Sequence, residues 1–218
     1  MLPLKDLTPS NILPVVTWLL IAANAVCFLF ELSAPDAGSF IYTYALVPRQ
    51  VDFAHPQTLW PFLTSMFLHA GWIHLISNMW FLRLFGDNTE AFFGRVGYLA
   101  VYLVSGFAGG LTQYAFGPGS GVPMLGASGA IAGVLGAYIV LYPRNEVQTL
   151  LFTFITVQVI RLPAMVALGY WFAIQLLAGV GTIGSEGGTA YFAHVGGFAT
   201  GAAVAFVMRR ISPPAAWP

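Results

Sequence analysis

The sequence predicts an all-α membrane protein folded as a bundle of six transmembrane helices. Of its 218 residues, 58% are hydrophobic and only 7% are charged, and the mean hydropathy is +0.78. A soluble domain carries about 25% charged residues, so this chain could not cover a water-facing surface. Long apolar runs give the number of helices, and the positions of the positive charges give their orientation.

The chain is expected to form a single membrane domain over residues 12–210. A short polar cytoplasmic lead, residues 1–11, precedes it, and a C-terminal tail, residues 211–218, follows it. The first span, residues 12–32, is longer than the roughly 7–15 apolar residues of a signal peptide, so we expect an uncleaved helix. Residues 33–68 are rich in proline and aromatic residues, which predicts a long, partly helical interfacial first loop.

Five further apolar stretches complete the predicted bundle. They are residues 71–90, 95–116, 125–142, 163–179 and 190–208. The apolar residues 147–162 are too few for a further span, which needs about 20 residues. We expect this stretch to be an interfacial or extended linker.

The positive charges predict the orientation of the bundle. Six spans put both termini on one side of the membrane. With the N-terminus inside, seven of the eight Lys and Arg residues lie at inner ends, namely Lys5, Arg83, Arg95, Arg144, Arg161, Arg209 and Arg210. Arg49 alone lies outside, so the positive-inside rule predicts an N-in, C-in topology. We expect a multi-pass protein of a prokaryotic plasma (inner) membrane.

Four polar residues fall at a similar depth in this topology. His74 and Asn78 lie in the first turns of the second span and share a face, because they are four residues apart. Ser128 lies in the first turn of the fourth span, and His194 lies about one turn into the sixth. All three spans enter from the outside, so the four side chains converge just below the outer surface. Polar groups inside a membrane are costly and typical of functional sites.

Small residues predict close contact between the fourth and sixth spans. They are Ala132 and Gly136 on the expected face of Ser128, and Gly197 and Gly201 after His194. Small side chains let helices approach closely in lipid. We therefore expect His194 Nε2 to come within hydrogen-bond reach of Ser128 Oγ.

A serine beside a histidine predicts nucleophilic catalysis. His194 would take the proton of Ser128 as Oγ attacks a peptide carbonyl. The carboxylates fall at span ends or in loops, which favours a dyad over a triad. His74, the Asn78 amide and the backbone N–H of Ser128 are the candidate donors for an oxyanion hole.

Neither a metal nor another cofactor is expected. His69 and His74 have no HExxH motif or comparable carboxylate beside them, and His69 is expected to have a structural hydrogen-bonding role. The net charge of zero gives no sign of a nucleic-acid partner, and no soluble partner is implied. The expected partners are transmembrane protein substrates and the lipid bilayer.

Each signal also has a simpler explanation. Gly126, Ser128 and Gly129 are typical of helix packing in membranes, and Ser128 could simply cap its helix. His194 alone could bond a neighbouring helix. A small transporter is a further alternative, but the inverted repeats and broken helices typical of that class are not visible. The shared depth of the polar residues favours the catalytic interpretation.

These motifs resemble those of the rhomboid family of intramembrane serine proteases. Residues 69–78 resemble the family's second-helix motif, and residues 86–90 resemble its inner end. Gly126-Ala127-Ser128-Gly129 resembles the nucleophile motif, and Ala193-His194 with Gly197 and Gly201 resembles the base motif.

The resemblance implies a six-helix bundle with a Ser128/His194 dyad and with His74 and Asn78 at the oxyanion hole. It also implies cleavage of transmembrane segments near the outer face, through an acyl-enzyme. His69, Gly126, Gly129, Gly197 and Gly201 would support the site. The alternative is a non-catalytic rhomboid-like protein that binds or escorts membrane clients.

Two positions depart from the family's pattern. Some members have an aromatic residue four positions after the serine, where it stacks on the base, but this chain has Ala132. The histidine must therefore be oriented in another way. Some members also carry Trp-Arg in the first loop, whereas here Trp60 is followed by Pro61.

Overall fold

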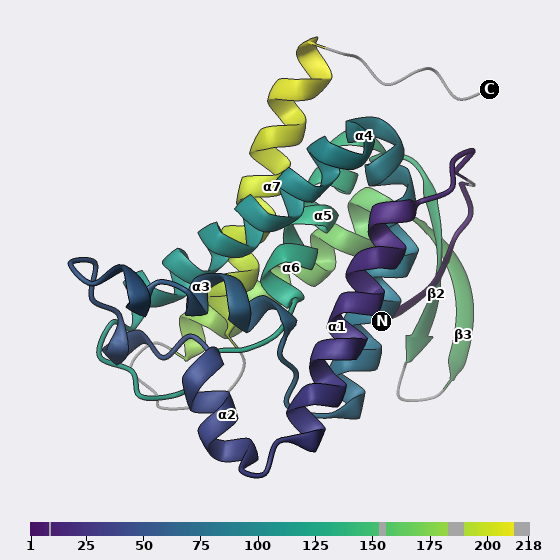
Figure 1. The fold of residues 1–218 in the computed structure, drawn as a ribbon. Helices are drawn as coiled ribbons and strands as arrows, with labels where there is room; N and C mark the ends of the chain where they lie inside the picture. Colours follow the sequence, from purple (N-terminus) through teal and green to yellow (C-terminus); the bar gives the residue numbers. More distant parts are fainter. Residues whose placement is uncertain (9, 153–155, 183–189, 212–218) are drawn as a thin grey trace.

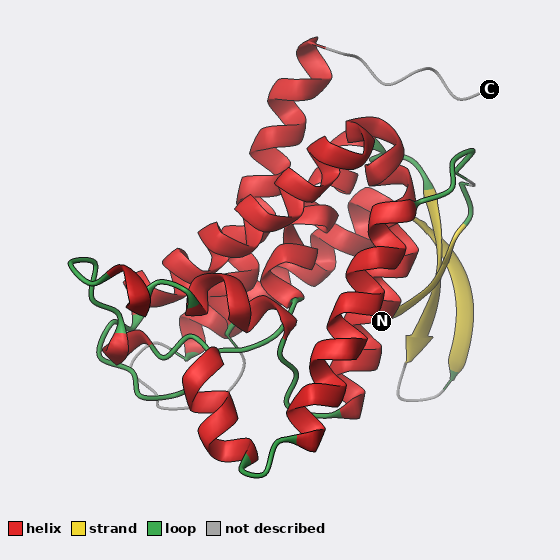
Figure 2. Ribbon diagram, viewed as in Figure 1, coloured by secondary structure: helices red, strands yellow, loops and turns green. Residues whose placement is uncertain are grey.

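The computed structural model describes residues 1–8, 10–152, 156–182 and 190–211. This part of the chain is mostly helical, with a small sheet at one side (Figures 1 and 2). The five longer helices are α1 (Val15–Ser33), α4 (Trp72–Phe116), α5 (Ser128–Leu141), α6 (Ala164–Gly181) and α7 (Tyr191–Ile211). Among the described helices, α1, α4, α6 and α7 are long and apolar enough to cross a membrane.

Helix α4 contains a sharp break that matches the predicted boundary between the second and third spans. Gly94 has φ 68° and ψ 170°, a left-handed conformation that glycine adopts easily. The two halves of α4 run away from this turn in different directions (Figure 1). Glu90, just before the turn, is fully buried, and its carboxylate accepts hydrogen bonds from the N–H groups of Val16 and Thr17 at 2.9 and 2.8 Å. It thereby caps the start of α1.

The first loop is partly helical, as predicted. Its short elements are α2 (Ala37–Tyr44), α3 (Pro61–Thr64) and the 3₁₀ turns η1 (Pro48–Gln50), η2 (Pro56–Thr58) and η3 (Ser65–Phe67). Three of them begin at proline, whose fixed φ suits the first position of a helix. Leu46 and Met124 exchange two backbone hydrogen bonds, and Gly126 N–H donates to the Ser65 carbonyl at 2.8 Å. These bonds tie the segment before α5 to the first loop.

The N-terminal lead and the linker before α6 form a sheet that the sequence analysis did not predict. Strands β1 (Leu2–Asp6), β2 (Glu146–Phe152) and β3 (Val157–Pro163) pair antiparallel in the order β1-β2-β3. Residues 147–162 were expected to be an interfacial or an extended linker, and the strands β2 and β3 show the extended form. Residues 1–11 were expected to be only a polar lead, but they contain the paired strand β1. Asp6 accepts hydrogen bonds from Tyr138 Oη at 2.5 Å and Asn88 Nδ2 at 2.7 Å. Burial raises the pKa of this carboxyl.

Helix α5 lies at the centre of the bundle, and most of its residues are buried. It packs against α7 through glycines: a Cβ at Gly197 would overlap the Gly129 carbonyl oxygen, and one at Gly201 would overlap that of Gly133. The close approach between the two helices is therefore as predicted. Ala132 and Gly136 were the two small residues of α5 predicted to face α7. The prediction was wrong by one residue at Ala132, which lines a cavity instead. Gly136 does face α7.

Candidate active site

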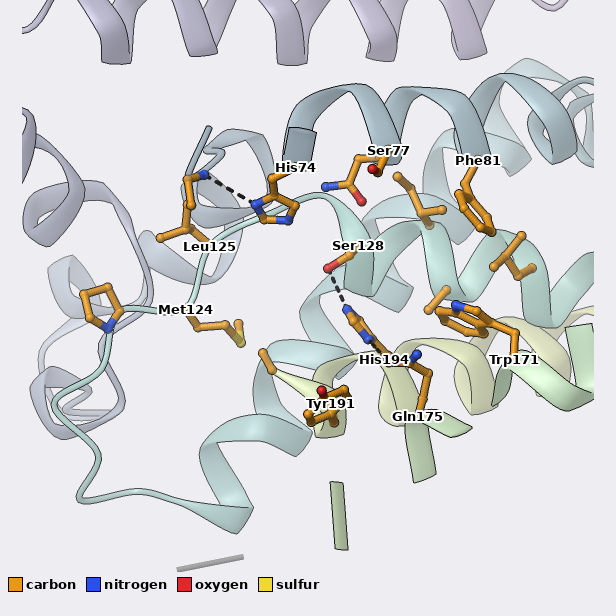
Figure 3. A pocket seen from close by; sticks show the side chains of 17 residues that line it. His74, Ser77, Phe81, Met124, Leu125, Ser128, Trp171, Gln175, Tyr191 and His194 are labelled. Carbon is orange, nitrogen blue, oxygen red and sulfur yellow. Dashed lines mark hydrogen bonds between the residues drawn. The ribbon is translucent and has the colours of Figure 1, made fainter. Parts of the chain in front are cut away.

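A cavity of about 710 Å³ lies among the first half of α4, the start of α5, α6 and α7. Its polar lining includes Asn78. It also includes His74, Ser128, Gln175 and His194, which are labelled in Figure 3. The structure therefore brings together, around one space, all four polar residues that the topology placed at one depth. Of these four, His74 and Asn78 come from α4, Ser128 from α5 and His194 from α7.

Ser128 and His194 are hydrogen-bonded across the α5–α7 contact. His194 Nε2 lies 2.8 Å from Ser128 Oγ (Figure 3). Ser128 is the first residue of α5, and His194 lies one turn into α7 and is 8% exposed. Close to this pair, a Cβ at Gly197 would overlap the Gly129 carbonyl oxygen, so a larger side chain at residue 197 would separate the two helices.

Gly126 shapes the approach to the serine. Its φ of 127° lies in the left-handed region, which L side chains rarely adopt. A Cβ at this position would also lie 2.8 Å from Cε1 and Nε2 of His74 and 3.6 Å from Ser128 Oγ. Glycine at residue 126 therefore lets the imidazole of His74 and the serine hydroxyl share one side of the cavity.

His74 presents a hydrogen-bond donor to the cavity. Its Nδ1 accepts the Ala70 N–H at 3.3 Å (Figure 3). A neutral imidazole has one protonated nitrogen, so this bond leaves the proton on Nε2. That nitrogen is the one beside Gly126, and its N–H can meet an oxygen that enters near Ser128.

Asn78 carries an unused donor. The residue is 7% exposed, and its Nδ2 is buried without a hydrogen-bond partner among the described residues. Buried amide groups are almost always hydrogen-bonded, so an exception at a cavity wall needs an explanation. A ligand oxygen in the cavity would supply the missing partner.

His69 is fully buried behind this wall. Its ring packs edge-on against His74, with centroids 5.1 Å apart, and against Phe28 at 6.5 Å. Neither ring nitrogen makes a hydrogen bond of ordinary geometry in the described part of the chain, although the Phe67 backbone is a weak partner of the ring. The backbone N–H of His69 donates to Glu31 Oε2 at 3.0 Å.

The sequence analysis missed two side chains that surround His194. Gln175 Oε1 lies 2.6 Å from His194 Nδ1, and the Trp171 ring lies 5.8 Å from the imidazole at an interplanar angle of 35°. Both come from α6, one turn apart. A signal was present, because Gln175 is the one amide side chain in this otherwise apolar helix.

The arrangement suits acyl transfer. Ser128 Oγ–H can donate to His194 Nε2, while N–H groups on the opposite wall face the same space. Within the described residues, no group of three or more His, Cys, Asp and Glu side chains is placed to hold a metal ion.

Comparisons with known proteins agree on one family. A family model described as Rhomboid domain matches residues 56–211. RHOMBOID-like protein 6, mitochondrial, of Arabidopsis thaliana is 34% identical over 158 residues, which cover 72% of this chain and 46% of that protein. Rhomboid protease GluP of Bacillus subtilis (strain 168) is 32% identical over 194 residues, or 88% and 35% of the two chains.

A third relative is named as inactive. Inactive rhomboid protein 1 of Drosophila melanogaster is 38% identical over 86 residues, which cover 39% of this chain and 6% of that protein. The chain spans less than half the length of each of these three relatives.

Proposed function

This chain belongs to the rhomboid family, and we propose that it is an intramembrane serine endopeptidase that cleaves transmembrane segments of other membrane proteins. The observation that carries the proposal is the 2.8 Å hydrogen bond between Ser128 Oγ and His194 Nε2 at a cavity wall. A hydroxyl paired with an imidazole is the usual activated nucleophile of acyl transfer.

The proposed reaction begins when Ser128 Oγ attacks the substrate carbonyl carbon and its proton passes to His194 Nε2. The resulting oxyanion accepts hydrogen bonds from His74 Nε2–H, the Asn78 amide and the Ser128 backbone N–H. The C–N bond then breaks, and the imidazolium gives its proton to the leaving amine. Water, deprotonated by His194, hydrolyses the acyl-enzyme and returns the proton to Ser128.

The length of α5 supports an intramembrane location for this chemistry. Its 14 residues rise about 21 Å, whereas the hydrocarbon layer is about 30 Å thick. If the end of α5 near Leu141 reaches the inner surface, Ser128 lies below the outer one. The substrate would then be cut inside the bilayer near its outer face, with water supplied through the cavity.

The chain is an integral membrane protein, and we propose six spans with both termini inside. The two halves of α4 and the short α5 would supply the spans beyond α1, α6 and α7. The prokaryotic plasma membrane is our proposed location; the relatives come from a plant, a bacterium and a fly.

The second candidate is a non-catalytic protein that binds or escorts membrane clients. The likeness to a relative named inactive favours it. The presence of both Ser128 and His194 in hydrogen-bond contact favours the protease.

A fluorophosphonate probe separates the two candidates without a known substrate. We expect purified protein to be labelled at Ser128, as mapped by mass spectrometry, and the labelling to be lost in His194→Ala. Ser77→Ala is the matched control, because Ser77 lines the same cavity and is expected to leave labelling unchanged. Undiminished labelling in His194→Ala, or none in folded wild-type protein, would favour the non-catalytic candidate.

A further inference from the structure

We propose that Gln175 is a positioning residue that holds His194 in the tautomer needed for a general base. This inference rests on the proposed proteolytic function. It extends the expected dyad to a serine–histidine–glutamine array, with the third member supplied by α6. The main evidence is the 2.6 Å contact between Gln175 Oε1 and His194 Nδ1.

The tautomer follows from the chemistry of the two neighbours. An amide oxygen can only accept a hydrogen bond, so the nitrogen that faces Gln175 Oε1 must carry the proton. The proton on Nδ1 leaves a lone pair on Nε2, which faces Ser128 Oγ at 2.8 Å. In the other tautomer Nε2–H would point at the serine and could not take its proton.

A glutamine is suited to a site inside a membrane. The Gln175 oxygen accepts from Nδ1–H of both the neutral imidazole and the imidazolium that forms during the reaction. A carboxylate would do the same but would place a second charge in an apolar surrounding, where an isolated charge is costly.

The other neighbours of the His194 ring do not fix its tautomer, so this role falls to Gln175 on α6. The other rings beside His194 are Trp171, at 5.8 Å and 35°, and Tyr191, at 6.5 Å and 90°. Neither accepts a hydrogen bond from Nδ1 in the structure. Ala132, four residues after the serine, is too small to hold the ring. Trp171 and Gln175 are four residues apart on α6 and share a face, so one helix limits both the plane and the tautomer of the base.

The first test measures the tautomer directly. In protein with ¹⁵N-labelled histidine, we expect a His194 signal with a protonated Nδ1 and an unprotonated Nε2. The signal is assigned by its absence in His194→Ala. An unprotonated Nδ1 in the wild-type protein would overturn the proposal, whatever any variant does.

The second test compares variants at residue 175 by the rate of fluorophosphonate labelling. Gln175→Met keeps the shape but removes the acceptor, and we expect the rate to fall at least about 10²-fold; a wrong tautomer in a serine protease costs about 10⁴-fold. Gln175→Glu restores an acceptor and should recover most of the rate. Its pH profile should have the acid limb moved to higher pH, because a carboxylate favours the protonated imidazole. Leu177→Ala, at an exposed position of α6, is the control and should label like wild type.

These labelling results distinguish a failure of the proposed protease function from a failure of the proposed role of Gln175. If wild-type protein is not labelled, the proposed function fails. If wild type and Gln175→Met are labelled equally fast, the serine is activated but Gln175 does not position its base.

Discussion

His74 and His194 hold their protons on different nitrogens, and the difference suits opposite tasks. His74 Nδ1 accepts the Ala70 N–H, so its Nε2 is a donor to the cavity. His194 Nδ1 faces the oxygen of Gln175, so its Nε2 is an acceptor for the serine proton. One histidine can therefore stabilise negative charge while the other acts as a base, and the assignment comes from one neighbour in each case.

Removal of the His74 donor should slow acylation without unfolding the protein. We expect His74→Phe to reduce the rate of fluorophosphonate labelling about 10²–10³-fold, which is typical for loss of one oxyanion-hole donor. The phosphoryl oxygen of the probe tests the same donors as a tetrahedral intermediate. His55→Gln is the control, since His55 lies in an exposed part of the first loop and contacts Asp52. A rate within two-fold of wild type, at unchanged melting temperature, would remove His74 from the oxyanion hole.

Single-residue features differ in how far the sequence predicts them. Ser128 and His194 were predictable as a pair, because polar residues beside small ones are conspicuous in an apolar chain. The bond between Gln175 and His194 was not, because it joins two helices whose relative rotation has no local sequence signal. The same uncertainty of rotation explains why the contact face of α5 was placed on Ala132 rather than on Gly129 and Gly133.

Elements were predictable where their signal is local. The break at Gly94 lies between two apolar runs, and the short helices of the first loop begin at prolines. The sheet is different, because β1 pairs Leu2 with Leu150. Strand pairing across most of the chain depends on what the folded bundle brings together, so neither β1 nor its register could be predicted from the residues of the polar lead.

The α5–α7 contact should be intolerant of a single added methyl group. In Gly201→Ala the new Cβ would overlap the Gly133 carbonyl, so α7 must move away from α5 and carry His194 with it. Overpacking costs about 1–3 kcal/mol or more, and we expect a lower melting temperature together with slower probe labelling.

Gly169→Ala is the matched control for this prediction. It lies within α6, where a Cβ would meet no atom within 4 Å. We expect unchanged or slightly higher stability, since alanine favours a helix by about 0.5–1 kcal/mol over glycine. Equal effects of the two substitutions would show that the glycine contact does not hold the helices together.

The whole molecule combines an uneven charge distribution with a site at one end of the bundle. In the proposed topology seven of the eight positive residues lie inside, and the turn at Gly94 and the start of β2 lie on that side. The residues that lead into Ser128 are bonded to the first loop, at the opposite end. Orientation in the membrane therefore decides on which face a substrate would be cut. Helix α5 has 14 residues and is shorter than the other helices that we propose as spans.

Cysteine accessibility tests both the orientation and the crossing of α5. Cys27 is first replaced by Ala, which leaves a chain without cysteine, and single cysteines are introduced as Gly119→Cys and Pro163→Cys. Gly119 precedes α5, and Pro163 pairs with Glu146 at the start of β2, just after α5. Both positions are exposed, and neither change alters a charge. With the N-terminus inside, a membrane-impermeant maleimide added to intact cells should label residue 119, and residue 163 should be labelled after permeabilisation. The reverse pattern would invert the orientation, and labelling of both from outside would mean that α5 does not cross, so that the chain could not have six spans.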